Sequence, residues 1–227
     1  MWLNAADGTR YLDPYNNVPA GWFVDAVDAV DVVHDAGGLM IADEVQSGFG
    51  RSGNMWGYET YGFVPDIVCM GKPIGNGYPV SGVAASHEMI SNVRKNNFYF
   101  NTYASSPMQA AVGMAVLDEI IDRDLVASVR DVGAKITASL QAMQTSHPEI
   151  GDVRGVGTFL GIDWVHPGST EPDIAGATAM QEALKERGVL ISRAGEHFNV
   201  FKVRPPLVFN HEHAEIFLMT FANALGK

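Results

Sequence analysis

Cysteine is nearly absent from this 227-residue chain: Cys69 is the only one, so no disulfide can form within it. A lone thiol fits a reducing compartment, and we therefore expect a cytoplasmic location. Positive charge is also scarce, because 15 lysine and arginine residues stand against 26 acidic ones, which gives a formal net charge of −11. This balance argues against nucleic acid or an anionic membrane as a partner.

Long apolar runs are missing as well, so no segment is expected to span a membrane. The first residues have no basic stretch followed by an apolar one, and we expect no signal peptide there. What remains is ordinary: 47% hydrophobic and 18% charged residues are typical of a folded protein and exclude disorder, collagen and coiled coil.

The hydrophobic pattern predicts an α/β fold with a covered sheet. Short apolar runs at 39–42, 66–70 and 80–85 indicate buried strands. Helical periodicity begins near Phe23, at the cap Ser106-Pro107, and again at 125–143, 175–187 and 210–225. We expect an N-terminal strand segment over 1–19, a large domain over 20–124 and a smaller α/β domain over 125–227.

Two acidic residues follow the first apolar strand, in the sequence Asp43-Glu44-Val45-Gln46. Ligands of α/β proteins bind beyond the carboxyl ends of strands, so a carboxylate here could ligate a metal, act as an acid or base, or pair with a cationic ring. The alternative is that Asp43 and Glu44 only cap the loop. If the chain stays extended, Asp43 and Val45 share one face, and Glu44 and Gln46 the other.

Lys72 is the only one of six lysines in an apolar setting rich in glycine and proline. A lysine just past a buried strand should be partly desolvated, which lowers its pKa and favours Schiff-base chemistry. The alternative is an exposed loop lysine. A phosphate-binding loop is rejected, because Asp66 stands at the position of its first glycine and Pro73 replaces its Ser or Thr.

Two further features are weaker. His211 and His213 form the only close histidine pair, but residues two apart on a helix do not face each other, so no metal site is expected. Arg204 precedes Pro205-Pro206 and could bind a carboxylate through two hydrogen bonds. An ion pair at a surface or between domains is the alternative.

Taken together, these segments resemble the class-III pyridoxal-phosphate aminotransferases. The resemblance is carried by IADEVQSGFGRSGNMWGYE, VPDIVCMGKPIGNGYPVSGVAAS, FNTYASSPMQAAVGMAVL, GDVRGVGTFLGIDW and KVRPPLVF, in this order. It extends over residues 20–227 and is closest to the branch that contains phospho-lyases acting on phosphorylated amino alcohols and amino acids.

The resemblance implies a fold type I enzyme with pyridoxal 5′-phosphate, in which an incomplete large domain with a mainly parallel sheet binds the cofactor. It also implies a homodimer with shared active sites, and one role for each candidate residue. Lys72 would form the internal aldimine, and Asp43 would pair with the pyridinium nitrogen. Val45 would pack on the ring, and Gln46 would approach its phenolic oxygen. Thr102 would reach the cofactor phosphate of the partner subunit, and Arg204 would bind a substrate carboxylate.

The implied function is transfer of an amino group from an amino acid to a keto acid. The alternatives are a phospho-lyase and a catalytically inactive remnant. MWLNAADGTRYLDPYNNVP also resembles the family's opening strands, yet the phosphate-binding loop that follows them in relatives is absent. We therefore expect a missing segment between Pro19 and Ala20, which would not be covalent neighbours in the folded molecule.

Overall fold

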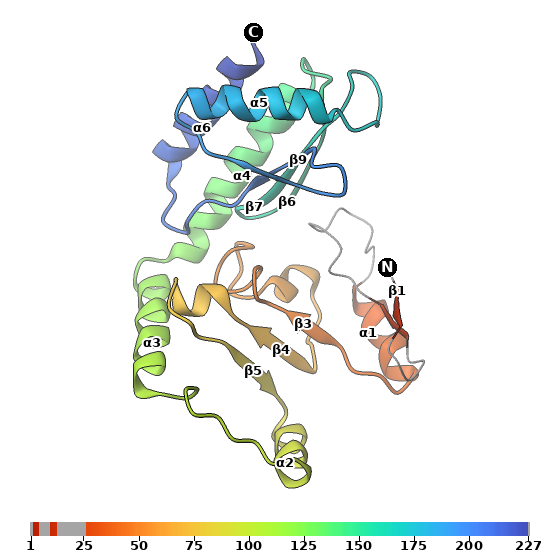
Figure 1. The fold of residues 1–227 in the computed structure, drawn as a ribbon, viewed down its shortest axis with the longest axis vertical. Coiled ribbons are helices and arrows are strands. Elements are labelled where there is room, and N and C mark those ends of the chain that lie inside the picture. Colours follow the sequence, from red (N-terminus) through yellow and green to blue (C-terminus); the bar gives the residue numbers. More distant parts are fainter. Residues whose placement is uncertain (1, 5–9, 13–25, 227) are drawn as a thin grey trace. The chain divides into compact units, whose positions relative to one another are not determined.

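The computed structural model describes residues 2–4, 10–12 and 26–226, with side chains from residue 29 onward (Figure 1). It has the expected α/β fold and divides into two compact units. One unit comprises 24–133 and 206–210, and the other comprises 1–23, 134–205 and 211–227. The domain boundaries expected from the sequence stay a prediction.

The unit formed by 24–133 and 206–210 contains a three-stranded sheet in the order β3-β4-β5. Its elements are α1 (Ala26–Asp35), β3 (Ile41–Asp43), the 3-10 helix η1 (Gly57–Tyr61), β4 (Ile67–Met70), the 3-10 helix η2 (Lys72–Gly75), β5 (Gly82–Ala85), α2 (His87–Asn96), α3 (Pro107–Asp122) and the start of α4 (Leu125–Gln144).

The strand pairing of this sheet corrects the expectation of a mainly parallel sheet. Strands β3 and β4 are parallel, with Asp43 opposite Cys69, but β4 and β5 are antiparallel, with Met70 opposite Gly82. The connection over 71–81 is the physical reason, because a parallel crossover needs a dozen or more residues and a helix that packs on the sheet. The sheet is therefore mixed.

A cluster centred on Phe49 forms the core of this unit. Phe49 is 2% exposed and packs with Ile120 and Leu125, and partly buried side chains of Met55, Trp56, Met70, Ile74, Val116, Leu117, Val126 and Leu207 surround it. Helix α3 begins at the predicted cap, where Ser106 Oγ accepts the N–H of Gln109 and the Gln109 side chain accepts the N–H of Ser106. Because Phe49 lies in the loop after β3, its contacts with Ile120 and Leu125 attach this loop to helices α3 and α4.

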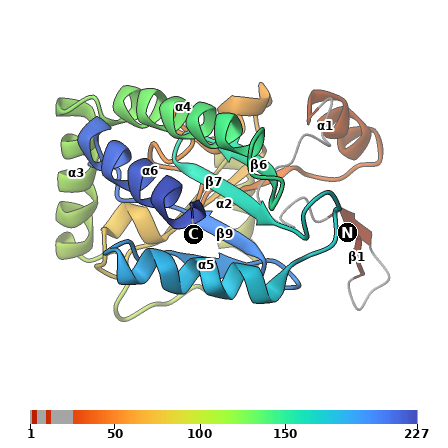
Figure 2. The same cartoon turned by 90° about the horizontal axis from the view of Figure 1, so that it is seen from above.

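The other unit is built on an antiparallel sheet in the order β6-β7-β9-β8. Its strands are β6 (Ile150–Val156), β7 (Phe159–Trp164), β8 (Ser192–Ala194) and β9 (Val200–Val203), and its helices are the later part of α4, α5 (Ile174–Glu186) and α6 (His211–Leu225). Helix α5 contacts both α6 and β7 (Figure 2).

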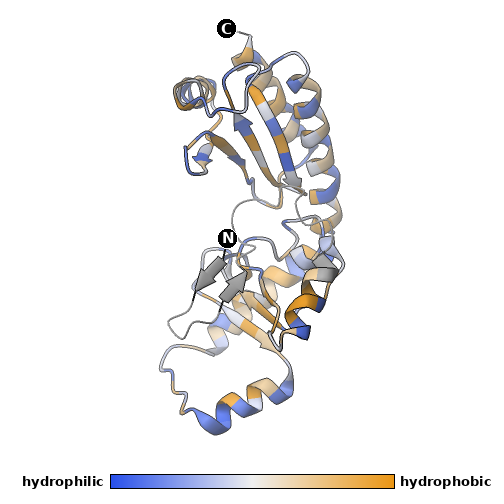
Figure 3. Ribbon diagram, turned by 90° about the vertical axis from the view of Figure 1, so that its right-hand side faces the viewer, coloured by the Kyte–Doolittle hydropathy of each residue, from blue (hydrophilic) through white to orange (hydrophobic). Residues whose placement is uncertain are grey.

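Side-chain alternation on β7 builds the core of this second sheet. Leu160, Ile162 and Trp164 are buried, and the Trp164 ring meets Phe201 of β9 edge to face at 5.6 Å between centroids. Figure 3 shows hydrophobic and hydrophilic residues alternating along these strands. The residues between them, such as Asp163, lie on the more polar face, where Asp163 pairs with Arg154.

The remaining sequence expectations concern the N-terminal segment and membrane-spanning runs. The expected N-terminal strand segment contains β1 (Trp2–Asn4) and β2 (Arg10–Leu12), which pair antiparallel. The expected break between Pro19 and Ala20 lies outside the described residues. No helix in the described part of the chain is long and apolar enough to cross a membrane.

Candidate active site

Asp43 is the last residue of β3, where the chain leaves the sheet and turns. Its side chain is exposed, and its Oδ1 accepts a hydrogen bond from the backbone N–H of Val45 at 3.0 Å. Ser47 Oγ donates to the Asp43 carbonyl at 3.3 Å, and Gly48 N donates to the Glu44 carbonyl at 3.2 Å. The strand therefore ends in a tight turn that presents the Asp43 carboxylate at the carboxyl edge of the sheet.

Glu44 points the opposite way and is 2% exposed. Its Oε2 accepts hydrogen bonds from Ser47 Oγ and Gly57 N, both at 2.8 Å, and its Oε1 accepts one from Tyr58 N at 2.9 Å. A buried carboxylate is tolerated only when donors replace its hydration, and these three do so. Glu44 thus caps the start of η1, which agrees with the alternative that this residue caps the loop. Asp43 is the exposed acid of the pair.

Gly57 allows this cap to form. A Cβ added at Gly57 would lie 2.5 Å from Ser47 Cβ and 3.1 Å from Glu44 Oε2, so any side chain would displace the turn. Tyr58, next to it, stacks with Trp56 at 6.5 Å between ring centroids. Burial raises the pKa of the Tyr58 phenol, and the negative charges of Glu59 and Glu44 raise it further.

Lys72 follows the neighbouring parallel strand, at the same edge of the sheet as Asp43. It is the first residue of η2 and has a φ of 26°, which a residue with a side chain rarely adopts. Gly71 just before it packs on Val45, whose Cγ atoms would lie 3.4 Å from a Cβ added at Gly71. The segment Asp43–Val45 and the pair Gly71-Lys72 therefore lie side by side.

The structure shows Lys72 as the exposed loop lysine that the sequence left as the alternative, and not as the partly desolvated one. Its side chain is exposed, because β4 ends at Met70 and the extended Gly71 turns the chain outward before η2 begins. Backbone strain of the kind seen at Lys72 costs free energy and persists where the surroundings fix it, often at functional sites. The position is thus marked by its conformation rather than by desolvation.

The remaining predicted residues lie elsewhere. Gln46 is half-buried within the turn after β3. Thr102 is exposed in the segment between α2 and α3, where Asn101 Oδ1 accepts the N–H groups of Tyr103 and Ala104, both at 2.9 Å. Arg204 belongs to the other compact unit, where its guanidinium carbon lies 4.2 Å from the centroid of the Phe159 ring.

Comparison with known proteins identifies the family to which this chain belongs. The model of the family described as aminotransferase class III matches residues 16–225. The chain belongs to the class-III aminotransferase family. This family is dependent on pyridoxal phosphate, and membership confirms the resemblance found in the sequence.

Individual relatives of this class-III chain include both lyases and transferases. Ethanolamine-phosphate phospho-lyase homolog 1 of Caenorhabditis elegans is 44% identical over 191 residues, which are 82% of this chain and 41% of that protein. Alanine–glyoxylate aminotransferase 2 homolog 2, mitochondrial, of Arabidopsis thaliana is 40% identical over 200 residues, 88% of this chain and 42% of that protein. The chain spans about two fifths of the length of these curated relatives.

Solved structures give the same picture for the class-III fold. A phospholyase from Arthrobacter in complex with phosphoethanolamine has a TM-score of 0.86 and 42% identity, covering 93% of this chain and 50% of its own. A transaminase with L-alanine has a TM-score of 0.76 and 32% identity, covering 92% of this chain and 46% of its own. Both solved structures therefore resemble this chain in sequence as well as in fold.

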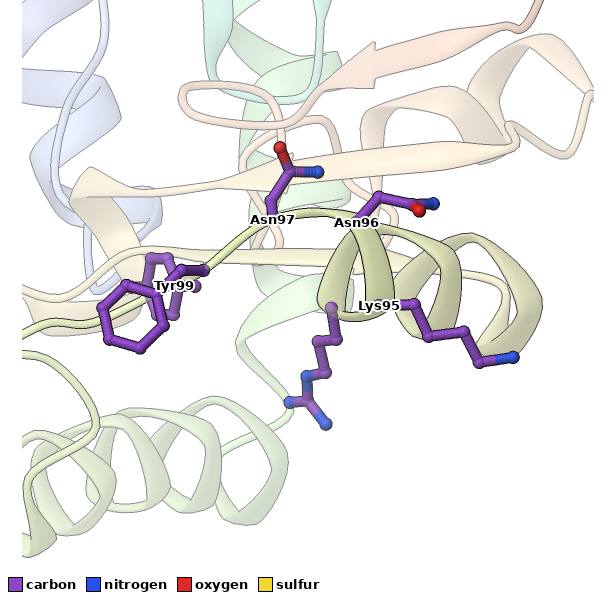
Figure 4. Close-up of a pocket in the computed structure, with 6 residues that line it drawn as sticks. Lys95, Asn96, Asn97 and Tyr99 are labelled. Carbon is purple, nitrogen blue, oxygen red and sulfur yellow. The ribbon is translucent and has the colours of Figure 1, made fainter.

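Two cavities are lined by other residues of the chain. One, of about 500 Å3, is at the end of α2 and is lined by Arg94, Lys95, Asn96, Asn97, Phe98 and Tyr99. Figure 4 shows Lys95, Asn96, Asn97 and Tyr99 projecting from this helix end and the segment after it. The other, of about 280 Å3, is bordered by Trp164 and α5. None of the six residues predicted from the sequence lines either cavity.

Sequence reasoning missed how Glu44 and Gly57 work together in this class-III chain. They are 13 positions apart, and no helical or strand period links them. The available signal was Gly57 itself, a glycine between two aromatic residues just after the Gly-rich loop. The described residues contain no cluster of histidine, cysteine and acidic side chains that could hold a metal ion.

Proposed function

We propose that this chain carries the catalytic lysine and ring-binding acid of a pyridoxal-phosphate enzyme that transfers an amino group from an amino acid to a keto acid. One observation carries the proposal: Asp43 and Lys72 follow adjacent parallel strands at the same edge of one sheet, and Val45 packs on Gly71 between them. In open α/β sheets this edge is where ligands bind.

The donor set suits this cofactor chemically. An exposed carboxylate, an exposed amine and an apolar side chain between them match a cationic ring that carries an aldehyde. Asp43 would accept a hydrogen bond from the ring nitrogen, Val45 would cover the ring, and Gln46 would meet its phenolic oxygen. Lys72 would hold the cofactor covalently through Nζ. Thr102 of a second copy would contact the phosphate, which makes a homodimer part of the proposal.

Pyridoxal phosphate, when bound, supplies an electron-withdrawing ring that stabilises a carbanion next to the substrate nitrogen. The chain's residues supply the rest. The negative charge of Asp43 keeps a proton on the ring nitrogen. As a free amine, Lys72 would accept the proton from the substrate's α-carbon at Nζ. It could then donate this proton to a different carbon atom. Arg204 would bind the substrate carboxylate through paired hydrogen bonds.

Covalent attachment tests the proposal directly. The chain is incubated with pyridoxal 5′-phosphate, reduced with borohydride and digested, and the modified peptide is identified by mass spectrometry. We expect the label on Lys72, and Lys72→Ala should lose it and all turnover. Lys95, an exposed lysine on α2, gives the matched control Lys95→Ala, which should keep both. Full turnover in Lys72→Ala would remove the assignment.

A phospho-lyase is the second candidate, favoured by the 44% identity to the Caenorhabditis elegans homolog and by the Arthrobacter structure. The two activities diverge after loss of the α-proton, since a lyase expels a phosphate from the neighbouring carbon. Incubation with phosphoethanolamine and with L-alanine plus a keto acid separates them. Phosphate release supports the lyase, and consumption of the keto acid supports the transferase.

A further inference from the structure

We propose that Glu44 is a positioning residue: its buried carboxylate clamps the start of η1 to the end of β3 and so fixes the turn that presents Asp43 and Val45. The cofactor part of this inference rests on the proposed function. The clamp itself rests only on contacts within the unit that contains β3 and is open to measurement without any cofactor.

The contacts of Glu44 run in two directions along the chain. Its backbone N–H donates to the Cys69 carbonyl at 2.9 Å, which extends the β3–β4 pairing one residue beyond the sheet. Its carboxylate receives Gly57 N and Tyr58 N, residues that lie beyond the Gly-rich loop 47–56. One residue therefore joins the sheet edge and the far end of the loop.

The turn held by this clamp contains the proposed ring-binding residues on either side of Glu44. Asp43 Oδ1 accepts the Val45 N–H, and Val45 packs on Gly71. If the carboxylate released Gly57 and Tyr58, the loop could move and the turn would lose its support on that side. Asp43 and Val45 would then present their side chains over a wider range of positions, although neither is itself changed.

The electrostatics require a carboxylate at this position. Three donors converge on two oxygens, so a glutamine of the same shape would keep one acceptor and turn an NH2 group toward at least one donor. A buried donor left without an acceptor costs more than the loss of an ordinary surface hydrogen bond. Glu44→Gln is therefore a sharp test, since it changes charge and acceptors but hardly any volume.

Glu59 provides the matched control. It is an exposed carboxylate within η1 and accepts the Trp56 N–H at 2.9 Å, a hydrogen bond that the amide oxygen of Glu59→Gln can keep. Glu59→Gln removes the same charge from η1 without touching the clamp. Ser47→Ala is a second variant that leaves the carboxylate in place. It removes one of the three donors to Glu44 and also the Ser47 hydrogen bond to the Asp43 carbonyl.

The first measurement is amide hydrogen exchange by NMR on the chain without cofactor. We expect the Gly57, Tyr58 and Val45 amides to exchange about tenfold to a hundredfold faster in Glu44→Gln, and these amides to stay at the parent rate in Glu59→Gln. If Glu44→Gln does not fold, Ser47→Ala should raise the same rates to a smaller extent. Unchanged exchange of Val45 in the folded variants overturns the inference.

The second measurement separates positioning from simple stability. With pyridoxal 5′-phosphate, the folded Glu44→Gln chain should still be labelled at Lys72 by borohydride, but with weaker induced circular dichroism of the cofactor band and about tenfold weaker binding. A parent-like cofactor spectrum alongside faster exchange would make Glu44 merely structural and overturn the positioning role. Absence of label in the parent chain removes the proposed function, while Val45 exchange still decides the clamp.

Discussion

The guanidinium carbon of Arg204 lies 4.2 Å from the centroid of the Phe159 ring. Leu160 is paired with Val203 in the antiparallel ladder, so continuing the register by one residue places Phe159 opposite Arg204. The ring therefore lies beneath the cation at the point where Pro205 and Pro206 fix an extended chain. The strand register and the ring contact together fix where the Arg204 side chain lies.

This contact gives the first prediction. A cation–π contact of a partly buried arginine is worth about 0.5–2 kcal/mol, so Phe159→Leu should release Arg204 and raise the KM for a carboxylated substrate about 2- to 30-fold, with kcat less affected. The Arg204 Nε–H resonance, free of the ring's field, should also move downfield. Phe198→Leu, at an exposed aromatic of the same unit, should leave both unchanged. A parent-like resonance in Phe159→Leu would contradict the prediction.

Asp43→Asn keeps the shape of the side chain but removes its charge. If Asp43 holds the proton on the ring nitrogen, turnover should fall by about a hundredfold or more, while labelling of Lys72 persists. Glu59→Gln is the suitable control carboxylate and should retain near-parent turnover. Glu44 is unsuitable as a neutral control, because its carboxylate is buried and accepts three hydrogen bonds. Equal turnover in Asp43→Asn and the parent would end the assignment.

The pairing of His34 with Asp66 predicts a pH dependence of stability. His34 Nε2 lies 2.9 Å from Asp66 Oδ2, and Met40 N donates to the same oxygen at 2.7 Å. The hydrogen bond with His34, and then that from Met40, lower the pKa of Asp66 below its ordinary value of 3.8. The unfolded chain thus binds this proton more readily, and the stabilisation is present above the unfolded pKa and is lost as pH falls through the lowered one.

We therefore expect Asp66→Asn to flatten the fall in unfolding free energy between about pH 5 and pH 2. His34→Ala should flatten it partly, because Met40 still donates. Urea denaturation at several pH values measures the slope, and the difference from the parent isolates Asp66 from the other acids. Identical slopes in the parent and Asp66→Asn would show that the pair contributes nothing.

Two glycines should respond oppositely to alanine. Gly57→Ala places a Cβ 2.5 Å from Ser47 Cβ and should cost about 1–3 kcal/mol of unfolding free energy. Gly113→Ala, inside α3, meets Ile74 only at an ordinary 3.8 Å and should stabilise by about 0.5–1 kcal/mol. Urea denaturation of both variants provides the comparison. A stabilised Gly57→Ala would show that the turn shifts to accommodate the added Cβ at no cost in free energy.

Local signals predicted much of the fold. The cap at Ser106, the strand ending at Met70 and the last helix beginning at His211 were legible because each depends on neighbouring residues: a capping side chain, a short apolar run and a periodic face. Helix α2 was not anticipated, because its sequence is mostly polar and its N-cap, Ser86, is the main local sign.

The candidate site was predictable only in part. Asp43 and Lys72 were found because each follows an apolar strand, and parallel pairing of these strands brings the two together. The cap by Glu44 depends on Gly57 and Tyr58, which come back to Glu44 only after the loop 47–56. Contacts between residues this far apart leave no local sequence pattern. The sequence left the exposure of Lys72 as one of two alternatives, because the direction of the chain after Met70 depends on Gly71 and on the strained φ of Lys72 itself.

The lone cysteine has a practical consequence. Cys69 is half-buried on the central strand of the mixed sheet, with Asp43 opposite it on one side and Val83 on the other. A thiol reagent can therefore modify the chain at one place only, and the rate of modification reports how often this strand becomes accessible. Cys69 is thus a natural probe beside the Asp43 turn. The rate at which a thiol reagent modifies it, with and without a ligand, measures protection of this strand without any introduced label.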